Sequence, residues 1–323
     1  MIPKVFVTRP LPAPALALLS SACEVRSFAE DKVIPIAQLA EECREVEGIL
    51  VNSARVSEEV LLAASKLRAV SNCGVGYDNI DIAACNRRRI PVTNTRGSLE
   101  ETTADLAFML LLATARRAIE SDRYVREGRW DRWQFGLLHG LDAHHKTLGL
   151  VGFGGIGQLM ARRGLGFSMR ILYHARHRAA ESIERQLRVE YSALETLLRE
   201  SDFVSLHVPL TPGTRHIIDG RAISLMKNTA ILVNTARGPV VDEEALVEAL
   251  SHGKIGGAGL DVFEEEPHVN PGFAKLNNVV LAPHIGSATG ETRLRMATLA
   301  VRNLLAMLAG ERPANVVNRE IYS

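Results

Sequence analysis

The chain has 323 residues, a length that corresponds to about two domains of roughly 150 residues each. It is 46% hydrophobic and carries 38 Lys and Arg against 37 Asp and Glu, a formal net charge of +1. This balance argues against a nucleic-acid-binding or anionic-membrane-binding protein, because both need clustered positive charge. High hydrophobicity with low net charge also argues against a disordered chain.

The four cysteines, Cys23, Cys43, Cys73 and Cys85, form no Cys-x-x-Cys pair, so we expect neither a structural zinc nor a dithiol site. We expect no other metal site at His139, His144 and His145, because adjacent residues do not point to one place in regular structure and no carboxylate cluster accompanies them. The first residues read as a strand and not as a secretory leader. No uncharged apolar run reaches the ~18–20 residues that cross a bilayer. We therefore expect a cytoplasmic protein with reduced thiols that binds no membrane.

Short apolar runs alternate with segments of helical spacing along the whole chain. The expected strands are 5–8, 48–52, 69–72, 92–94, 147–152, 170–173, 203–206, 230–234, 257–261 and 279–282. The expected helices are 58–65, 101–117, 156–163, 193–200, 243–252 and 291–310. This alternation in both halves predicts an α/β fold with two domains built on parallel sheets.

The last of these helices carries an apolar stripe, which predicts that it packs onto a domain core. The stripe consists of Leu294, Ala297, Val301, Leu304 and Leu308.

A Gly-x-Gly-x-x-Gly sequence at Gly152, Gly154 and Gly157 is the sharpest local motif. It follows the expected strand at 147–151 and precedes a helical segment, which is the context of a dinucleotide-binding turn. In such a turn the first glycine allows the tight bend, the second lets the backbone approach a pyrophosphate, and the third lets the helix pack against the sheet. The helix N-terminus then offers its N–H groups to the phosphates.

The end of the next strand predicts the form of the cofactor. NAD-binding folds usually place Asp or Glu there to bind the ribose 2′-hydroxyl, but this chain has Ala175, followed by Arg176 and Arg178. Guanidinium groups bind a 2′-phosphate through forked hydrogen bonds, and a carboxylate would repel it. We therefore expect NADP(H), against the alternative of a solvated basic loop.

Five motifs in order resemble the D-isomer-specific 2-hydroxyacid dehydrogenase family over nearly the whole chain. They are residues 72–81, the glycine loop, residues 234–238, residues 259–263 with Glu266-Pro267, and residues 283–287. Within the family, residues 144–149, 171–176 and 238–242 resemble NADPH-dependent 2-ketogluconate and glyoxylate/hydroxypyruvate reductases.

The resemblance implies that Arg237, Glu266 and His284 are catalytic. In this assignment His284 protonates the oxygen formed when hydride reaches the C2 carbonyl of a 2-keto acid. Glu266 fixes the histidine tautomer and favours the imidazolium. Arg237 polarises the carbonyl and binds the carboxylate of the substrate.

The resemblance also implies the binding residues. The substrate carboxylate would meet backbone N–H groups of Val75 and Gly76, with Arg55 as a further basic contact. The implied cofactor contacts are Thr103, Gly152, Gly154, Gly155, Ile156, Gly157, Ala175, Arg176, Arg178, Val208, Pro209, Thr235, Ala236, Asp261 and Gly286. Gly155 departs from the family pattern, which often has Arg at this place.

The family's layout implies two Rossmann-like domains, with the cofactor domain inserted in a flavodoxin-like substrate domain. The substrate domain would be residues 1–98 and 287–323, and the dinucleotide-binding domain residues 99–286. The resemblance also implies a homodimer formed through the cofactor domain.

The expected function is NADPH-dependent reduction of glyoxylate, hydroxypyruvate or 2-ketogluconate to a D-2-hydroxy acid. Two alternatives stay open. One is an NAD-dependent dehydrogenase of the phosphoglycerate or D-lactate type, against which Ala175 and Arg176 argue. The other is a nucleotide-sensing protein without turnover, like the corepressors of the family.

Overall fold

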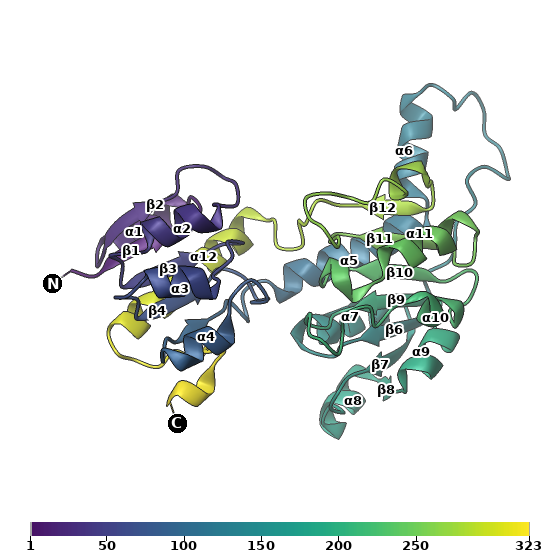
Figure 1. The fold of residues 1–323 in the computed structure, drawn as a ribbon. Helices are drawn as coiled ribbons and strands as arrows, with labels where there is room; N and C mark the ends of the chain where they lie inside the picture. The colour runs from purple at the N-terminus through teal and green to yellow at the C-terminus, as the bar shows by residue number, and fades with distance from the viewer. Residues whose placement is uncertain (1, 323) are drawn as a thin grey trace. The chain divides into compact units, whose positions relative to one another are not determined.

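The computed structural model describes residues 2–322, which divide into two compact units (Figure 1). The first unit consists of the described residues up to Leu99 together with those from Ser287 onward, and the second is Glu100–Gly286. The second unit is therefore inserted in the sequence between two segments of the first.

The first unit is built on a five-stranded parallel sheet. Across the sheet the strands are β2 (Glu24–Ser27), β1 (Lys4–Val7), β3 (Gly48–Val51), β4 (Ala69–Asn72) and β5 (Val92–Thr93). The order 2-1-3-4-5 is that of the flavodoxin-like fold. The helices are α1 (Ala13–Ser20), α2 (Ile36–Glu42), α3 (Glu58–Ala63), α4 (Ile82–Arg87) and α12 (Gly290–Leu308).

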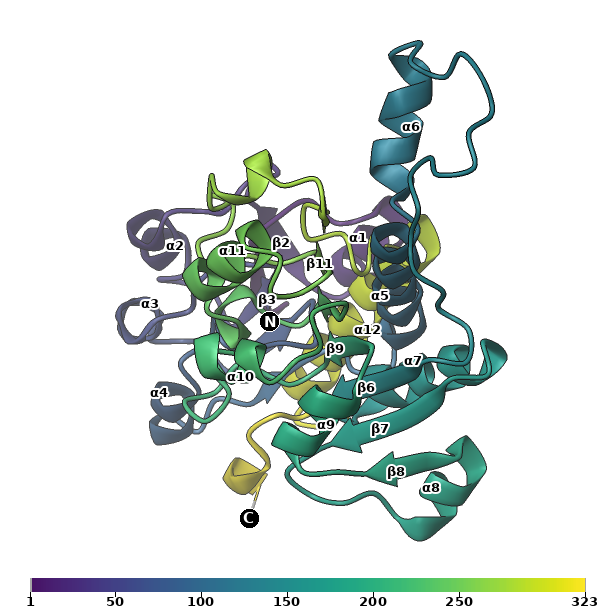
Figure 2. The same ribbon diagram turned by 90° about the vertical axis from the view of Figure 1, so that its right-hand side faces the viewer.

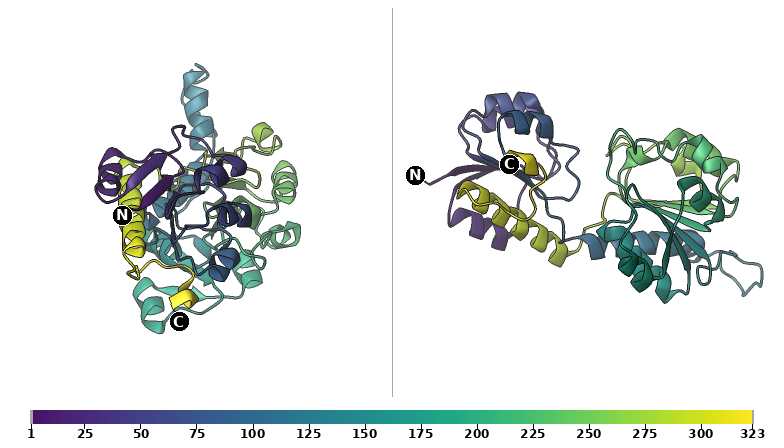
Figure 3. Two further views of the ribbon diagram at one scale, coloured as in Figure 1. Left: turned by 60° about the vertical axis from the view of Figure 1, so that its left-hand side comes forward. Right: turned by 90° about the horizontal axis from the view of Figure 1, so that it is seen from below.

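Two layers of helices cover this sheet, with α1 and α12 on one face and α2, α3 and α4 on the other (Figure 3). The apolar stripe predicted on α12 is confirmed at Ala297, Val301, Leu304 and Leu308, which are buried against strands of the sheet. Leu294, near the start of the helix, is only partly buried. The chain after α12 ends in the 3-10 turn η3 (Arg319–Tyr322).

The second unit is built on a seven-stranded parallel sheet. Across the sheet the strands are β12 (Val279–Leu281), β11 (Gly257–Leu260), β10 (Ile231–Asn234), β9 (Phe203–Leu206), β6 (Thr147–Val151), β7 (Arg170–His174) and β8 (Val189–Tyr191). The chain starts at β6, runs outward to β8, and then returns to β9 and runs the other way. The strand order therefore reverses between β6 and β9, where ligands of such sheets bind.

Helices also cover both faces of this sheet. One face carries α5 (Glu100–Ala115), α7 (Gly155–Gly166) and α8 (Glu181–Leu187). The other face carries α9 (Leu194–Glu200), α10 (Gly220–Ser224) and α11 (Glu243–Ser251). The short 3-10 turns η1 (Gly238–Val240) and η2 (Phe273–Lys275) lie in loops of this unit.

Helix α6 (Ala118–Arg126) differs from the rest because none of its residues is buried. It projects from the second unit, and the loop that follows it returns to β6 (Figure 2). Trp130, Trp133 and Phe135 in that loop are exposed by 56%, 76% and 81%. This segment, residues 118–141, is called the arm below.

The predicted α/β fold with two parallel sheets is confirmed, and every predicted strand and helix is present with ends that differ by a few residues. Two strands were missed, β2 and β8. Each lies at an edge of its sheet and is short and largely polar, so it lacks the apolar run by which the other strands were found. Six short helices were also missed: α1, α2, α4, α6, α8 and α10.

Two further observations concern the described residues. None of their helices is long and apolar enough to cross a bilayer. All four cysteines are free thiols, with Cys73 partly buried and the other three buried.

Candidate active site

The glycine loop lies at the carboxyl end of β6, at the point where the strand order reverses. Gly152 has φ +99°, and a Cβ there would lie 2.5 Å from the carbonyl group of His207 after β9. A Cβ on Gly157 would lie 2.3 Å from the Gly152 oxygen. Packing of the protein itself therefore requires both glycines. A Cβ on Gly154 would meet no atom within 4 Å, so the space beside this residue is open.

Helix α7 begins directly after Gly154, which has no side chain to cap it. The first N–H groups of the helix, at Gly155 and Ile156, are therefore offered to a ligand at its N-terminus. A Cβ at Gly155 would lie 3.1 Å from Cγ of Glu100. The open space beside Gly154 and this uncapped helix end fit a dinucleotide pyrophosphate.

The loop after β7 is fixed by a buried carboxylate. Nε and Nη2 of Arg178 each donate to Glu184 at 2.8 Å, and the hydroxyl of Tyr173 donates to Glu184 at 2.5 Å. These two partners hold the pKa of Glu184 low, at about 2. Arg176 is exposed on the same loop beside Ala175 and forms no ion pair within residues 2–322.

Further predicted cofactor residues lie at the carboxyl ends of the neighbouring strands. Val208 and Pro209 follow β9, and Thr235 and Ala236 follow β10. The hydroxyl of Thr235 is buried and has no hydrogen-bond partner among the described residues. An orphaned buried hydroxyl is costly unless a ligand satisfies it, so this atom also fits a bound cofactor.

Asp261 brings three predicted residues together after β11. Its carboxylate accepts hydrogen bonds from Ile285 N–H at 2.7 Å and from Gly286 N–H at 2.8 Å. A Cβ at Gly286 would lie 3.4 Å from Cγ2 of Thr103 on α5. Burial raises the pKa of Asp261 more than these hydrogen bonds lower it. The aspartate thus fixes the loop that carries His284.

His284 and Glu266 form a hydrogen-bonded pair. Nδ1 of His284 lies 2.7 Å from Oε2 of Glu266, and the other oxygen of Glu266 accepts from Phe263 N–H at 3.1 Å. The backbone of His284 has φ +53°, and its N–H donates to the carbonyl of Asp261 at 2.9 Å. A histidine in the left-handed region costs conformational energy, and such positions concentrate at functional sites.

The pKa of Glu266 is lowered by its neighbours. Burial alone would raise it, but the hydrogen bond and charge of His284, the Phe263 N–H and the charge of Arg237 together outweigh burial. Glu266 is therefore an ionised acceptor that holds Nδ1–H of His284 and leaves Nε2 for a substrate.

Arg237 lies in a tight turn after β10. The buried amide of Asn234 forms this turn, because its Nδ2 donates to the Arg237 carbonyl at 2.9 Å and its oxygen accepts from Ala236 N–H at 3.0 Å. Nη1 of Arg237 donates to the Ala236 carbonyl at 2.8 Å. The structure thus brings Arg237, Glu266 and His284 to the same edge of the seven-stranded sheet.

In the first unit, two asparagines fix the loop that contains Val75 and Gly76. Nδ2 of Asn72 donates to the carbonyls of Gly74 at 3.1 Å and Gly76 at 2.7 Å, and Asn94 donates to the carbonyl of Val75 at 2.9 Å. Amide groups thus bind three successive carbonyls of this loop. Arg55 follows β3 and is exposed.

The positioning asparagines Asn72, Asn94 and Asn234 were not predicted as site residues, although each ends or follows a strand. That position was the signal, because asparagine amides there can bind loop backbone groups. Glu184 carried no comparable signal, because its partners come together only in the fold.

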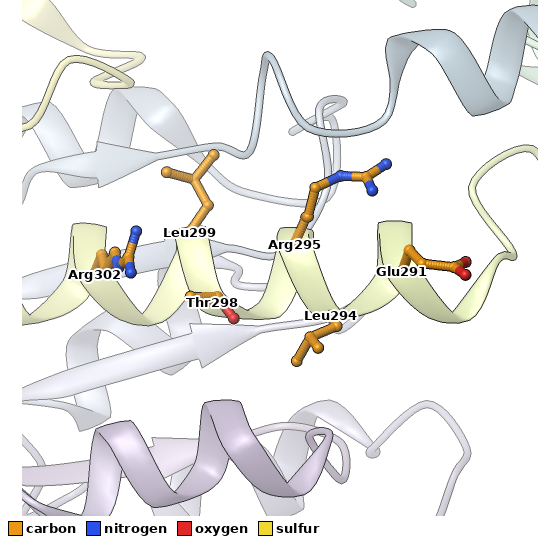
Figure 4. Close-up of a pocket in the computed structure, with 6 residues that line it drawn as sticks. All are labelled: Glu291, Leu294, Arg295, Thr298, Leu299 and Arg302. Atoms are coloured by element: carbon orange, nitrogen blue, oxygen red, sulfur yellow. The ribbon is translucent and has the colours of Figure 1, made fainter.

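Other features lie away from these residues. Six residues of α12 line one cavity: Glu291, Leu294, Arg295, Thr298, Leu299 and Arg302 (Figure 4). A second cavity lies at the base of the arm, beside Arg117 and His139. Among the described residues, no group of three or more His, Cys, Asp or Glu side chains is arranged to hold a metal ion.

Comparisons with known proteins agree with this geometry. Residues 108–286 match the family described as D-isomer specific 2-hydroxyacid dehydrogenase, NAD binding domain. The glyoxylate reductase of Pyrococcus horikoshii is 51% identical to this chain, over 99% of this chain and 97% of that protein.

Two solved structures are similar to this chain over nearly its full length. The TT0316 protein from Thermus thermophilus has a TM-score of 0.91 and 45% identity, covering 97% of this chain and 99% of that one. The NADPH-dependent glyoxylate/hydroxypyruvate reductase of Sinorhizobium meliloti, solved with NADP and malonate, has a TM-score of 0.89 and 34% identity, covering 98% and 97%.

Fold and site together define an α/β oxidoreductase with an NAD(P)-binding domain. The length and level of these similarities then decide the family. The chain belongs to the D-isomer specific 2-hydroxyacid dehydrogenases.

Proposed function

We propose that this protein reduces small 2-keto acids to D-2-hydroxy acids with NADPH as the electron donor. Glyoxylate, hydroxypyruvate and 2-ketogluconate are the candidate substrates. The observation that carries the proposal is the hydrogen-bonded pair of Glu266 and His284 at the sheet edge that also holds Arg237. The full-length similarity to glyoxylate reductases supports glyoxylate as the first substrate to test.

His284, Glu266 and Arg237 have different roles in the proposed reduction. A bound reduced nicotinamide supplies the hydride that reduces the carbonyl carbon. Nε2 of His284 donates a proton to the carbonyl oxygen, on which negative charge develops. Glu266 keeps the ring oriented through its hydrogen bond with Nδ1. Arg237 binds the substrate carboxylate and polarises the carbonyl.

NADPH is proposed over NADH because of the loop after β7. Ala175 removes the carboxylate that would bind a 2′-hydroxyl, and Arg176 presents an exposed guanidinium. Arg178 uses two of its five N–H groups on Glu184, so three remain for a phosphate. The Sinorhizobium meliloti relative, which was solved with NADP, supports the same choice.

We further propose the second unit as the dinucleotide-binding domain and the first as the substrate-binding domain. Gly152, Gly154, Gly155, Ile156 and Gly157 are assigned to the pyrophosphate. Thr103, Val208, Pro209, Thr235, Ala236, Asp261 and Gly286 are assigned to the rest of the dinucleotide. Val75, Gly76 and Arg55 are assigned to the substrate, since a loop with its carbonyls bound by amides suits an anion.

A homodimer formed through the second unit is part of the proposal. The exposed aromatic residues Trp130, Trp133 and Phe135 on the arm support it, because isolated proteins seldom expose such a group of aromatic side chains. Analytical ultracentrifugation should give twice the chain mass of 35.3 kDa, and a species of the chain mass would contradict it.

The four free cysteines favour a reducing compartment such as the cytoplasm.

The deciding experiment compares kcat/KM for the three 2-keto acids with NADPH and with NADH. Turnover of at least one acid, with NADPH preferred, supports the proposal. Preference for NADH would favour an NAD-dependent enzyme. Cofactor binding without turnover of any 2-keto acid would favour a nucleotide-sensing protein. His284→Ala serves as the control for turnover by this site.

A further inference from the structure

Two loops that carry proposed catalytic residues are in direct backbone contact in the second unit. One loop follows β10 and carries Arg237, and the other follows β11 and carries Glu266. A Cβ at Gly238 would lie 1.9 Å from the carbonyl carbon of Phe263 and 2.3 Å from N of Glu264. Nothing larger than glycine fits at this contact, so the two backbones set each other's position.

Three polar side chains outside the proposed site hold this contact together. Glu264 N–H donates to Oε1 of Glu243 at 2.6 Å, and the Glu264 carboxylate is hydrogen-bonded to Nε2 of His216. His216 also donates its backbone N–H to the carbonyl of Pro239 at 2.8 Å. His216 thus binds both loops, and Glu243 binds the β11 loop from the start of α11, which follows the β10 loop.

Glu243 is a buried side chain, exposed by 6%. Burial is the main reason that its pKa is raised, with the neighbouring glutamates adding to the effect. A buried carboxyl is costly, and this one accepts a backbone N–H of the β11 loop. His216 and Glu264 are partly exposed, so the contact between their side chains adds little to global stability.

The held backbone is the one that orients Glu266. Oε1 of Glu266 accepts the N–H of Phe263, the residue directly before Glu264. Any displacement of residues 263 and 264 therefore moves the acceptor that fixes Nδ1 of His284.

We infer that His216, Glu243 and Glu264 form a loop clamp that positions the Glu266–His284 pair relative to Arg237. They are positioning residues, and the inference rests on the proposed reductase function. Chemistry that depends on the placement of an acid loses rate when that placement drifts by an ångström or less.

The test uses four variants of the full chain. Glu264→Ala and His216→Ala remove the hydrogen bond between these side chains and keep the backbone N–H of residue 264. Glu264→Gln keeps an oxygen that can accept from His216, so it is the conservative rescue. Glu248→Ala is the control, because it removes an exposed ion pair of the second unit, with Lys254, outside both loops.

Kinetics give the first readout. Glu264→Ala and His216→Ala should lower kcat for the best 2-keto acid by about ten- to hundredfold, with cofactor KM within about twofold. The primary isotope effect with deuterated reduced cofactor should rise, because hydride transfer becomes slower. Glu264→Gln should recover most of kcat, and Glu248→Ala should match the wild type. A purely structural role would lower the amount of active enzyme without changing the isotope effect.

Crystal structures of the same unliganded variants give a readout that needs no turnover. In Glu264→Ala and His216→Ala the contacts of Glu266 with Phe263 N–H and His284 Nδ1 should be lost, and both should persist in Glu264→Gln and Glu248→Ala. If these contacts persist in both alanine variants, or if kcat and the isotope effect stay unchanged in them, the clamp is overturned. If the wild type reduces no 2-keto acid, the proposed function fails and the crystal structures alone decide the clamp.

Discussion

Both carboxylate oxygens of Glu184 accept hydrogen bonds from the guanidinium group of Arg178, at 2.8 Å each. The Tyr173 hydroxyl that also donates to Glu184 accepts the N–H of Ala179, so the network closes on the backbone of the β7–α8 loop. The charge of Arg178 is balanced by Glu184 within the protein. Arg176 therefore carries the unbalanced positive charge of this loop.

This difference between the two arginines predicts the cofactor preference of variants. Arg176→Ala should lower kcat/KM for NADPH by about ten- to hundredfold, since a charge-assisted hydrogen bond contributes roughly 1.5–3 kcal/mol. Its kcat/KM for NADH should change little. Ala175→Asp combined with Arg176→Ala should move the preference to NADH. Arg185→Ala, at an exposed position on α8, is the control. An unchanged NADPH to NADH ratio in Arg176→Ala would contradict the assignment.

The low pKa of Glu184 predicts how stability depends on pH. A carboxylate with pKa about 2 in the folded state and about 4.3 when unfolded stabilises the fold above the unfolded pKa. This contribution is lost as pH falls toward 2. Glu184→Gln should therefore be less stable than wild type at pH 7, and the difference should shrink between about pH 5 and 2. Urea midpoints across this range measure it, and a constant difference would refute it.

Alanine should have different effects at two positions of the glycine loop, Gly154 and Gly157. Gly154→Ala should leave the urea midpoint unchanged and weaken cofactor binding, because the added methyl group enters open space beside the helix end. Gly157→Ala should destabilise the fold by about 1–3 kcal/mol, because its Cβ meets the Gly152 oxygen at 2.3 Å. Calorimetric cofactor titration together with urea unfolding separates the two. Equal destabilisation by both changes would show that Gly154 is needed for packing.

His284 is predicted to act in chemistry and not in cofactor binding. His284→Ala should lower kcat by about 10²–10⁴-fold, the usual contribution of a general acid. The Kd for NADPH, measured by fluorescence titration, should stay close to that of the wild type. Glu266→Gln should cause a smaller loss, because the amide oxygen can still accept from Nδ1 and orient the ring. A kcat close to wild type in His284→Ala would rule out the proton-donor role.

His207 provides a second pH-dependent prediction. Burial lowers its pKa to about 3, so its imidazole is neutral in the folded state while the unfolded chain takes up a proton below about pH 6.5. The wild type should therefore lose stability on acidification between about pH 6 and 3. Relative to His207→Asn, the wild type should lose free energy of unfolding at a rate that approaches about 1.4 kcal/mol per pH unit, because unfolding takes up one additional proton. Parallel stability curves for the two proteins would show that His207 does not titrate in this way.

The strands that consist of continuous apolar runs were predicted from the sequence, because parallel strands buried on both faces have that composition. Edge strands such as β2, with sequence EVRS, are largely exposed and contain no apolar run. The glycine loop was predictable because its three glycines have the spacing of a dinucleotide-binding turn and lie between an expected strand and an expected helix. Arg237, Glu266 and His284 were predicted from the family motifs, since no local pattern links residues so far apart.

The residues that hold these groups were not predictable from sequence in the same way. Glu243 binds the N–H of Glu264, 21 residues later, and the two belong to different strand-to-helix connections. His216 and Glu264 are 48 residues apart. Only the sheet topology brings such pairs together, and each residue taken alone resembles an ordinary surface charge.

The insertion of the second unit between Leu99 and Ser287 has a consequence for synthesis on the ribosome. Strands β1, β3 and β4 share a core with α12, through Val5, Leu50 and Leu304 among others. Helix α12 is translated only after all of Glu100–Gly286. The nascent chain therefore holds a sheet face that α1 covers only in part, while the inserted unit already has every residue it needs to fold. The part of the protein that is synthesised first is therefore the last to complete its core.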